Sequence, residues 1–544
     1  MTVVASVVGV AVVLLVSAVA AAPRVRRYAD DSDFHLAARA VPPWWNASAV
    51  GSGFTSAAAF LGLGGLVALY GAPVLWYPVG VVVGYVVLLT LVVAPLRRSG
   101  AYTIADFARW RLGSTAVRRV VIGFVLLIGL AYLMAQIQAA GAVLHVLAGT
   151  PPWAACSAAA VVVAVVSIGG SMTSVQAVQF WMMLAVLALG AVVLAFAWLA
   201  GAAGPPVAEL PPGFAVPYGA AGEETRGGWA GGPLGVAAGD LSPLGVLTIV
   251  VAAALGTMGL PHVVVRFYAN PDGWAARRTV VAVLGMLGLF YLIPPVYGVL
   301  GGLYAPGAPA DQMMLLLPSR MLPGTPGALL TGLLVAGAFA AFLATSCGVV
   351  VTVGGMVSSY VLGGGLNGLR VTVAGLLAAA LGLIWLASPG SSLTLVLLGL
   401  TVAAAALCPL LVLGIWWRRL STAGAVAGML AGGGTVAGLI GLAAYAPDAA
   451  GAAGRYPALV AVPVAFAVMV GVSALTPGRI PAGSEEMMAR MHIPERLAGG
   501  VLARSPLGRA SVGESSIDHS AYENPGSGSG DSDRSSRRND HSAD

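Results

Sequence analysis

Long apolar runs follow one another along this chain of 544 residues and decide what it can fold into. A helix that crosses a bilayer needs roughly 20 mostly apolar residues. Thirteen runs of about this kind occur, with approximate limits 2–22, 51–71, 75–96, 120–148, 153–169, 176–201, 243–264, 279–303, 327–361, 371–388, 391–417, 422–445 and 456–475. The pattern predicts an all-α, polytopic membrane protein with about thirteen transmembrane helices.

Composition agrees with a membrane protein and excludes several other classes. Hydrophobic residues make up 58% of the chain and charged residues only 9%, whereas soluble domains carry about 25% charged residues. The three cysteines, Cys156, Cys347 and Cys408, lie in apolar runs and form no CxxC pair, which excludes a disulfide scaffold and gives no sign of metal or redox chemistry. No run offers a nucleophile–base pair. We therefore expect neither an enzyme nor a nucleic-acid binder, and no cofactor.

The basic residues are all arginine, and their distribution predicts how the helices are oriented. If the N-terminus lies outside and the thirteen helices alternate, 24 of the 27 arginines fall on the inner side. Only Arg226, Arg320 and Arg455 fall outside. Cytoplasmic loops are enriched in basic residues. We expect a multi-pass protein of the plasma membrane with its N-terminus outside and its C-terminus in the cytoplasm.

The first run could be confused with a cleaved signal peptide, because Ala20–Ala22 resembles a cleavage site. Its charges argue against that reading. Arg24, Arg26 and Arg27 follow the run, and no positive charge precedes it, which is the reverse of a signal peptide. We therefore predict an uncleaved first helix.

Two polar segments interrupt or follow the apolar runs. Residues 203–242 are rich in glycine and proline and predict an outer loop with short helical pieces. We expect the transmembrane domain to cover 1–480 and a cytoplasmic segment to cover 481–544. From about residue 503 the chain is mostly Ser, Gly, Asp and Arg, too polar to fold alone, so it is expected to be disordered.

Acidic residues are absent from the predicted spans. The nearest are Asp106 and Asp240, and only His145 and His262 lie in or near spans, both at predicted helix ends. Proton-driven carriers usually relay protons through an intramembrane Asp, Glu or His. Sodium can instead be held by backbone carbonyls and hydroxyls around a broken helix. The sequence leaves room for sodium coupling without requiring it.

Glycine and proline mark two runs that lie five runs apart. The run 51–71 is glycine-rich, and the run 243–264 contains GTMGLPH at 256–262. This spacing suits two five-helix inverted repeats over about 51–202 and 243–417. These residues either break each helix near mid-membrane, as in transporters whose half-helices face an anionic solute, or only permit close packing. Both readings stay open at this point.

Hydroxyl side chains gather in the run 327–361. Thr345, Ser346 and Thr352 occur within a few turns of one another. In a membrane helix, such a hydroxyl usually bonds to a carbonyl one turn earlier in its own helix. From this local chemistry alone, we assign no function to these three hydroxyls.

Several segments resemble one known family. They are DSDFHLAARAVPPWWNASAVGSGFTSAAAFLG (31–62), GAYTIADFARWRLG (100–113), AQIQAAGAVLHVLAG (135–149), GGSMTSVQAVQFWMML (169–184), GTMGLPHVVVRFYANPDGWAARRTV (256–280) and WWRRLSTAGAVAGMLAG (416–432). The chain resembles the sodium/solute symporter family, and specifically its acetate or monocarboxylate permease branch, over roughly residues 1–480. The most specific segment is 256–280. The resemblance implies the five-plus-five inverted-repeat core of the leucine transporter.

The resemblance also implies a set of site residues. A sodium ion would lie between the first core helix and the eighth, which is the run 327–361. The substrate would lie between the two broken helices. Carried over by position, the sodium residues are Ser52, Thr55, Ala341, Ala344 and Thr345, and the substrate-binding residues are Ala59, Phe60, Leu63, Thr257, Leu260 and Pro261.

The implied pocket is small and has few polar groups. Sugar carriers of the family have an Asn-Gln type pair where this chain has Leu260 and Pro261, so a short carboxylate fits better than a sugar. The acetate branch tends to have Ser and Asn before Pro409, where this chain has Ala405 and Leu407. This departure leaves the exact solute open.

We predict sodium-coupled symport of a small monocarboxylate such as acetate into the cell by alternating access. Sodium, the carboxylate and the lipid bilayer are the expected partners. The alternatives are symport of pyruvate, propionate or an amino acid, and a sensor that kept the fold without transport. Arg266, Arg277 and Arg278 are expected in an inner loop, where they anchor topology and do not bind substrate.

Overall fold

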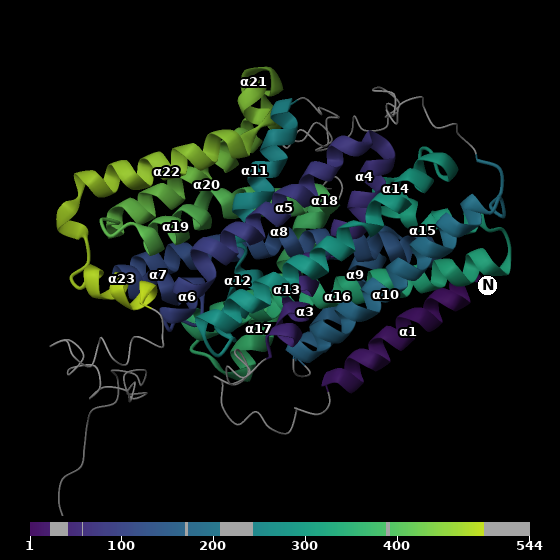
Figure 1. Cartoon of the computed structure of the whole chain (residues 1–544), viewed down its shortest axis with the longest axis horizontal. Helices are drawn as coiled ribbons and strands as arrows, with labels where there is room; N and C mark the ends of the chain where they lie inside the picture. Colours follow the sequence, from purple (N-terminus) through teal and green to yellow (C-terminus); the bar gives the residue numbers. More distant parts are fainter. Residues whose placement is uncertain (22–41, 57, 169–171, 207–242, 388–391, 494–544) are drawn as a thin grey trace, which may run out of the picture. The chain divides into compact units, whose positions relative to one another are not determined.

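The computed structural model describes residues 1–21, 42–56, 58–168, 172–206, 243–387 and 392–493. These residues form helices joined by turns, without any β-strand among them (Figure 1). Residues Met1–His492 form one compact unit. Most of the predicted outer loop 203–242 and the predicted disordered tail from 503 lie outside the described residues.

The first part of the chain supplies the elements that correspond to the predicted first repeat, preceded by one helix. In order they are α1 (Thr2–Ala21), α3 (Pro43–Phe54), η3 (Ala58–Gly62), α4 (Leu63–Tyr70), η4 (Ala72–Leu75), α5 (Trp76–Val87), η5 (Leu88–Val92), α6 (Val93–Arg98), α7 (Ile104–Leu112), α8 (Thr115–Ala148), α9 (Pro152–Ile168) and α10 (Met172–Leu199).

The remaining elements cover the predicted second repeat and the C-terminal helices. They are α11 (Pro243–Gly259), α12 (Pro261–Tyr268), α13 (Gly273–Tyr291), α14 (Ile293–Tyr304), α15 (Ala310–Met321), α16 (Thr325–Val361), α17 (Gly365–Ala387), α18 (Ser392–Val402), η8 (Ala403–Leu407), α19 (Cys408–Trp416), α20 (Thr422–Tyr445), α21 (Pro447–Arg455), α22 (Pro457–Leu475), η9 (Pro477–Arg479) and α23 (Ser484–His492).

All thirteen predicted runs are helical in the structure. Within the described residues, eleven helices are long and apolar enough to cross a membrane, and the bent pair α3–α4 makes a twelfth. The predicted run 153–169 is α9, whose apolar part, Pro152–Ser167, is shorter than the others. By length and composition, the described residues therefore contain eleven or twelve candidate membrane spans. The shorter helix α9 corresponds to the remaining predicted one.

Two predicted boundaries on the functional helices are corrected. The run 51–71 begins earlier, at Pro43, where proline fits the first turn of a helix. The run 243–264 continues through α12 to Tyr268. Arg266 therefore belongs to a span and not to the inner loop in which it was predicted.

The helix α16 occupies the centre of the bundle. The most apolar stretch of α16 is 100% buried within the protein, whereas that of α1 is 17% buried. The helices α1, α3, α8 and α10 all pack against α16. A helix that is apolar on every side belongs in the interior. This position brings α16 next to the first broken helix.

Glycines allow neighbouring backbones to approach closely. A Cβ atom at Gly256 would lie 2.4 Å from the carbonyl oxygen of Leu400, and one at Gly259 would lie 2.6 Å from that of Ala403. A Cβ atom at Gly65 would lie 2.1 Å from the carbonyl oxygen of Ala310. These three glycines are helical and serve close packing. Of the two readings left open by the sequence, packing therefore accounts for the glycines themselves, and the breaks fall beside them.

Candidate functional site

The first broken helix bends sharply after α3. The axes of α3 and the following segment differ by 62°, and a π-helical turn, η3, starts the outgoing half. The amide of Ser56 donates to the carbonyl of Phe54 at 2.9 Å. In a regular helix it would donate to the carbonyl of Ser52, four residues earlier. The break thus leaves the Ser52 carbonyl without its usual helical donor.

The hydroxyl of Thr345 takes the place of that missing donor. Its Oγ1 atom donates to the carbonyl oxygen of Ser52 at 2.8 Å, across from α16 to α3. Both residues are buried. The expectation that such a hydroxyl bonds its own helix is therefore wrong for Thr345. Two neutral oxygens from a broken helix and a neighbouring helix are the kind of ligand that sodium uses in such transporters.

The other predicted sodium residues are close in sequence to Ser52 or Thr345, and their polar groups differ in the hydrogen bonds that they already make. The hydroxyl and the amide of Thr55 both donate to the carbonyl of Gly51. Ala341 lies one turn before Thr345 on α16 and is buried. The carbonyl of Ala344 accepts a hydrogen bond of 2.9 Å from the Nε2 atom of Gln176. One of the predicted carbonyls is therefore already held by α10.

The second broken helix is interrupted at Leu260 alone. The helix α11 ends at Gly259 and α12 begins at Pro261, which has no amide hydrogen to continue the ladder. The carbonyl of Leu260 accepts from the amides of Val263 and Val264 at 3.2 and 2.9 Å. The hydroxyl of Thr257 donates to the carbonyl of Ala253 in its own helix. The carbonyl of Leu260 and the hydroxyl of Thr257 are therefore satisfied within the second broken helix itself.

The predicted substrate residues are all buried, but they face different neighbours. The π-helical turn η3, which carries Ala59 and Phe60, packs against α4, α8, α15 and α18, and Leu63 begins α4. Thr257 lies against α5, where a Cβ atom at Gly84 would be 2.8 Å from that of Thr257. Ala59 and Phe60 therefore lie against other helices than Thr257 does.

His262 links the two broken helices. It lies in the first turn of α12, at a helix end as predicted, and this end falls inside the span Pro243–Tyr268. A Cβ atom built on Gly53 in α3 would lie 3.5 Å from its ring, and its ring meets that of Tyr132 edge-on at 4.9 Å between centroids. Its Nε2 atom has no hydrogen-bond partner among the described residues.

Four buried tyrosines accompany His262, and sequence reasoning missed them. Tyr85 contacts the ring of Phe54 in α3 at 5.9 Å between centroids, and Tyr77 contacts Tyr291 at 6.5 Å. The hydroxyls of Tyr85 and Tyr132 have no hydrogen-bond partner within the part of the chain described, whereas the hydroxyls of Tyr77 and Tyr291 interact with each other.

Unpaired hydroxyls of this kind are informative, because buried polar groups in proteins are nearly always hydrogen-bonded. The hydroxyl of Tyr132, whose ring contacts His262, and the hydroxyl of Tyr85, whose ring contacts Phe54 in α3, are therefore candidates to receive a polar ligand. The available signal in the sequence was the spacing of Tyr77 and Tyr85, which are eight residues apart and so share one face of α5. The partners on α8 and α13 carry no such signal.

A second polar network surrounds Arg266. Its guanidinium donates to the hydroxyl of Thr173 at 2.9 Å and to the Oε1 atom of Gln176, while its carbonyl accepts from Asn46 in α3 at 2.9 Å. Arg266 is 9% exposed. Because Gln176 also donates to the carbonyl of Ala344, the network connects α3, α12, α10 and α16.

At the other half of the first broken helix, one carboxylate is buried between spans. Asp311 in α15 accepts hydrogen bonds from the amide and the hydroxyl of Ser392 at 3.0 and 2.8 Å. Burial raises the pKa of Asp311, and the two hydrogen bonds from Ser392 partly oppose that change. The helix α15 packs against η3 and α4. This contact fastens the outgoing half of the first broken helix.

Metal-binding side chains do not cluster in the described residues. No group of three or more His, Cys, Asp or Glu side chains is placed to hold a metal ion there. The oxygens at the first break are carbonyls and a hydroxyl, which suit an alkali cation better than a transition metal.

The chain is similar to proteins of a single functional kind. Residues 34–432 match the sodium:solute symporter family. The chain is 30% identical over 437 residues to the monocarboxylic acid transporter of Corynebacterium glutamicum, covering 74% of this chain and 77% of that protein. It is 28% identical over 428 residues to the uncharacterized symporter YwcA of Bacillus subtilis, covering 75% and 80%.

Solved structures of two transporters share the fold. A sodium-coupled sialic acid symporter, in a substrate-bound outward-open state, superposes with a TM-score of 0.65 over 87% of this chain and 98% of that one, at 12% identity. Mhp1, a nucleobase-cation-symport-1 family transporter, gives 0.53 over 85% and 99%, at 14% identity. At these identities the likeness establishes the fold, which is that of the leucine transporter as predicted.

Proposed function

Because the chain belongs to the sodium:solute symporter family, whose members are transporters and not enzymes, we propose that it carries a small monocarboxylate such as acetate into the cell together with sodium. The bond between Thr345 and the Ser52 carbonyl is the observation that carries this proposal. The relative that transports monocarboxylic acids supports the substrate class.

The sodium site would lie where α16 meets the first break. The Ser52 carbonyl and the Thr345 hydroxyl would bind the ion, with the carbonyls of Thr55, Ala341 and Ala344 as further ligands. When sodium is bound, the Thr345 hydroxyl must turn its lone pair toward the ion and give up its bond to Ser52. The ion would then replace that hydrogen bond as the link between α3 and α16.

The carboxylate would bind at the tyrosine hydroxyls and His262. Each hydroxyl can donate one hydrogen bond, and a carboxylate can accept several. The cluster touches α3 through Phe54 and Tyr85, and α12 through His262 and Tyr132. A substrate held there would contact both broken helices, which is what coupling requires. The predicted substrate residues on η3, Ala59 and Phe60, would contribute apolar surface on the side of the first broken helix.

Alternating access would use the two polar contacts at opposite halves of the first broken helix. With the N-terminus outside, the arginines place α3, α6 and α12 at the cytoplasmic side. The contact of Asp311 with Ser392 would then close the outer side, and the bonds of Arg266 to Asn46 and Gln176 would close the inner side. Sodium bound at Ser52 would favour one of these arrangements over the other.

The test is uptake of labelled acetate into proteoliposomes, with and without an inward sodium gradient. We expect sodium-driven uptake that pyruvate and propionate compete with to different degrees. Thr345→Val should remove the sodium dependence, and Thr345→Ser, which keeps the hydroxyl, should retain it. Uptake that follows a proton gradient and ignores sodium would contradict the coupling site. Carboxylates that are not taken up under either gradient would contradict the substrate class and favour the amino-acid or sensor alternative.

A further inference from the structure

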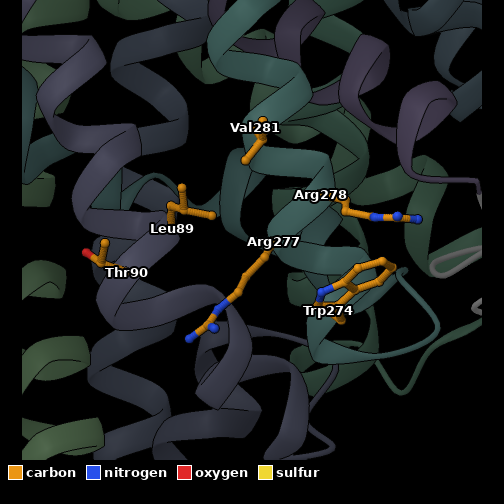
Figure 2. Close-up of a pocket in the computed structure, with 6 residues that line it drawn as sticks. All are labelled: Leu89, Thr90, Trp274, Arg277, Arg278 and Val281. Carbon is orange, nitrogen blue, oxygen red and sulfur yellow. The ribbon is translucent and has the colours of Figure 1, made fainter.

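A surface groove of about 580 Å³ opens between η5 and the first turns of α13 (Figure 2). The transport proposal makes no use of it. Its lining combines apolar and cationic side chains, and Trp274 and Val281 are 56% and 57% exposed. The lining residues are Leu89, Thr90, Trp274, Arg277, Arg278 and Val281.

The cationic groups of the groove lack acidic partners. Arg277 extends toward the helix that carries Thr90, and Arg278 lies over the ring of Trp274 at 3.5 Å from the ring centroid (Figure 2). Within the described residues, no carboxylate pairs with either arginine. The nearest acid in sequence, Asp272, caps α13 by accepting from the amide of Ala275 at 2.6 Å. The groove therefore presents two positive charges that the described residues leave without a counter-ion.

The turn before α13 shows that the groove lies at the end of the membrane spans. The guanidinium of Arg97, which ends the preceding apolar span with Arg98, donates to the carbonyl of Pro271 in that turn at 2.7 Å. A tryptophan and arginines at the end of a span are typical of the boundary between lipid headgroups and acyl chains. Leu89 and Val281 continue the groove from this boundary toward the apolar interior (Figure 2).

We propose that the groove binds an anionic phospholipid. Arg277 binds its phosphate, Arg278 lies with Trp274 at the level of the headgroup and glycerol, and one acyl chain lies along Leu89 and Val281. Arginine suits this role because its planar donors match phosphate oxygens in pairs. Basic pockets between membrane helices on the cytoplasmic side bind lipid headgroups in this way. Under the proposed orientation the lipid belongs to the cytoplasmic leaflet.

The bound lipid acts on the helix that supports the first break. In the residue after Arg278, the hydroxyl of Thr279 donates to the Oδ1 atom of Asn270 at 2.8 Å and approaches the carbonyl of Pro43 at 3.4 Å. The helix α13 packs directly against α3. A lipid that fixes the start of α13 therefore stabilises the position of α3 relative to α13.

The experiment measures retention of lipid by the purified full-length protein in detergent, by native mass spectrometry. The probes are phosphatidylglycerol and phosphatidylcholine with identical acyl chains, without sodium or substrate. We expect the wild type to prefer phosphatidylglycerol. The double variant Arg277→Gln with Arg278→Gln should weaken its binding about tenfold or more, since it removes both positive charges of the groove.

A matched control removes the same charge elsewhere. Arg370 and Arg419 are both exposed, and Arg370→Gln with Arg419→Gln should leave the preference unchanged. Equal loss in both double variants would overturn the proposal, because net charge alone would then explain binding. Equal retention of the two lipids by the wild type, or displacement of phosphatidylglycerol by inorganic phosphate, would also overturn it. Because the readout needs no transport, its outcome is independent of the proposed substrate and coupling ion.

Discussion

The two broken helices differ in how far they are broken. The first bends by 62° and resumes as a π-helical turn, whereas the second is interrupted only at Leu260. In the first, the carbonyl of Ser52 receives its hydrogen bond from Thr345 on another helix. In the second, the carbonyl of Leu260 receives its bonds from α12 itself.

This difference indicates at which break a carbonyl can exchange its hydrogen-bond donor for an ion. A backbone group inside a membrane must be satisfied by some donor or ion. The carbonyl of Ser52 depends on a side chain that can rotate away, so an ion can replace it. The carbonyl of Leu260 accepts from backbone amides of α12, which cannot rotate away, so an ion cannot readily replace them. The second break instead positions His262 beside α3 and Arg266 beside α10.

The largest expected effect comes from filling the close contact that precedes the second break. Gly259→Val would place side-chain atoms against the carbonyl of Ala403, which a Cβ atom already approaches to 2.6 Å. Rigid backbone cannot yield, so we expect destabilisation of about 3 kcal/mol or more and little folded protein. Fluorescence-detected size-exclusion chromatography measures the folded yield.

The matched control for this substitution is Gly285→Val. A Cβ atom at Gly285, which is also helical, meets no atom within 4 Å. Its folded yield should stay near that of the wild type. A folded yield of Gly259→Val equal to that of the wild type would contradict the packing role of this glycine.

Removing one tyrosine hydroxyl should have the next largest effect. Tyr85→Phe deletes a hydroxyl that has no partner among the described residues, so the fold should be kept. A hydrogen bond to a charged ligand contributes roughly 1.5–3 kcal/mol, which predicts an increase of about tenfold or more in the KM for acetate. Sodium activation should change little.

Tyr297→Phe provides the comparison for the tyrosine substitution. The Tyr297 hydroxyl donates to the carbonyl of Leu187 at 3.0 Å and is thus already satisfied. We expect reduced stability without a change in KM. An unchanged KM in Tyr85→Phe would remove the tyrosine hydroxyls from the substrate site.

A smaller effect is expected where the two breaks communicate. Gln176→Met removes the donor to the carbonyl of Ala344 and the acceptor for Arg266. A typical hydrogen bond contributes about 1 kcal/mol, so the sodium concentration for half-maximal uptake should shift several-fold. Asn46→Ala, which removes only the bond to the carbonyl of Arg266, is the comparison. An identical shift in both variants would show that the link to Ala344 has no separate role.

Much of the architecture follows from patterns local in sequence. Apolar length located all thirteen helical runs, and glycine with proline marked the two runs that contain the breaks. The extent of each break could not be predicted, because it depends on which donor satisfies which carbonyl. The position of Thr345 opposite Ser52 followed from the family resemblance, since local chemistry alone favoured a bond within its own helix.

The features missed by sequence reasoning depend on distant elements. The tyrosine hydroxyls come from α5, α8 and α13, and nothing in any one run indicates that they meet. Arg266 was placed in a loop because a charged residue normally ends a span. Its hydrogen bonds to Thr173 and Gln176 on α10 satisfy the guanidinium and so allow Arg266 to lie inside a span. The same lack of long-range information hid the burial of Asp311.

Sodium binding at the first break can be measured without transport. Thermal unfolding of the purified protein would be followed in sodium chloride and in potassium chloride, for the wild type, Thr345→Ser and Thr345→Val. A ligand at 100 times its Kd stabilises by about 2.7 kcal/mol. We predict a sodium-specific rise in Tm for the wild type and Thr345→Ser, and none for Thr345→Val. A full sodium-specific rise in Thr345→Val would contradict the placement of the ion at Ser52 and Thr345.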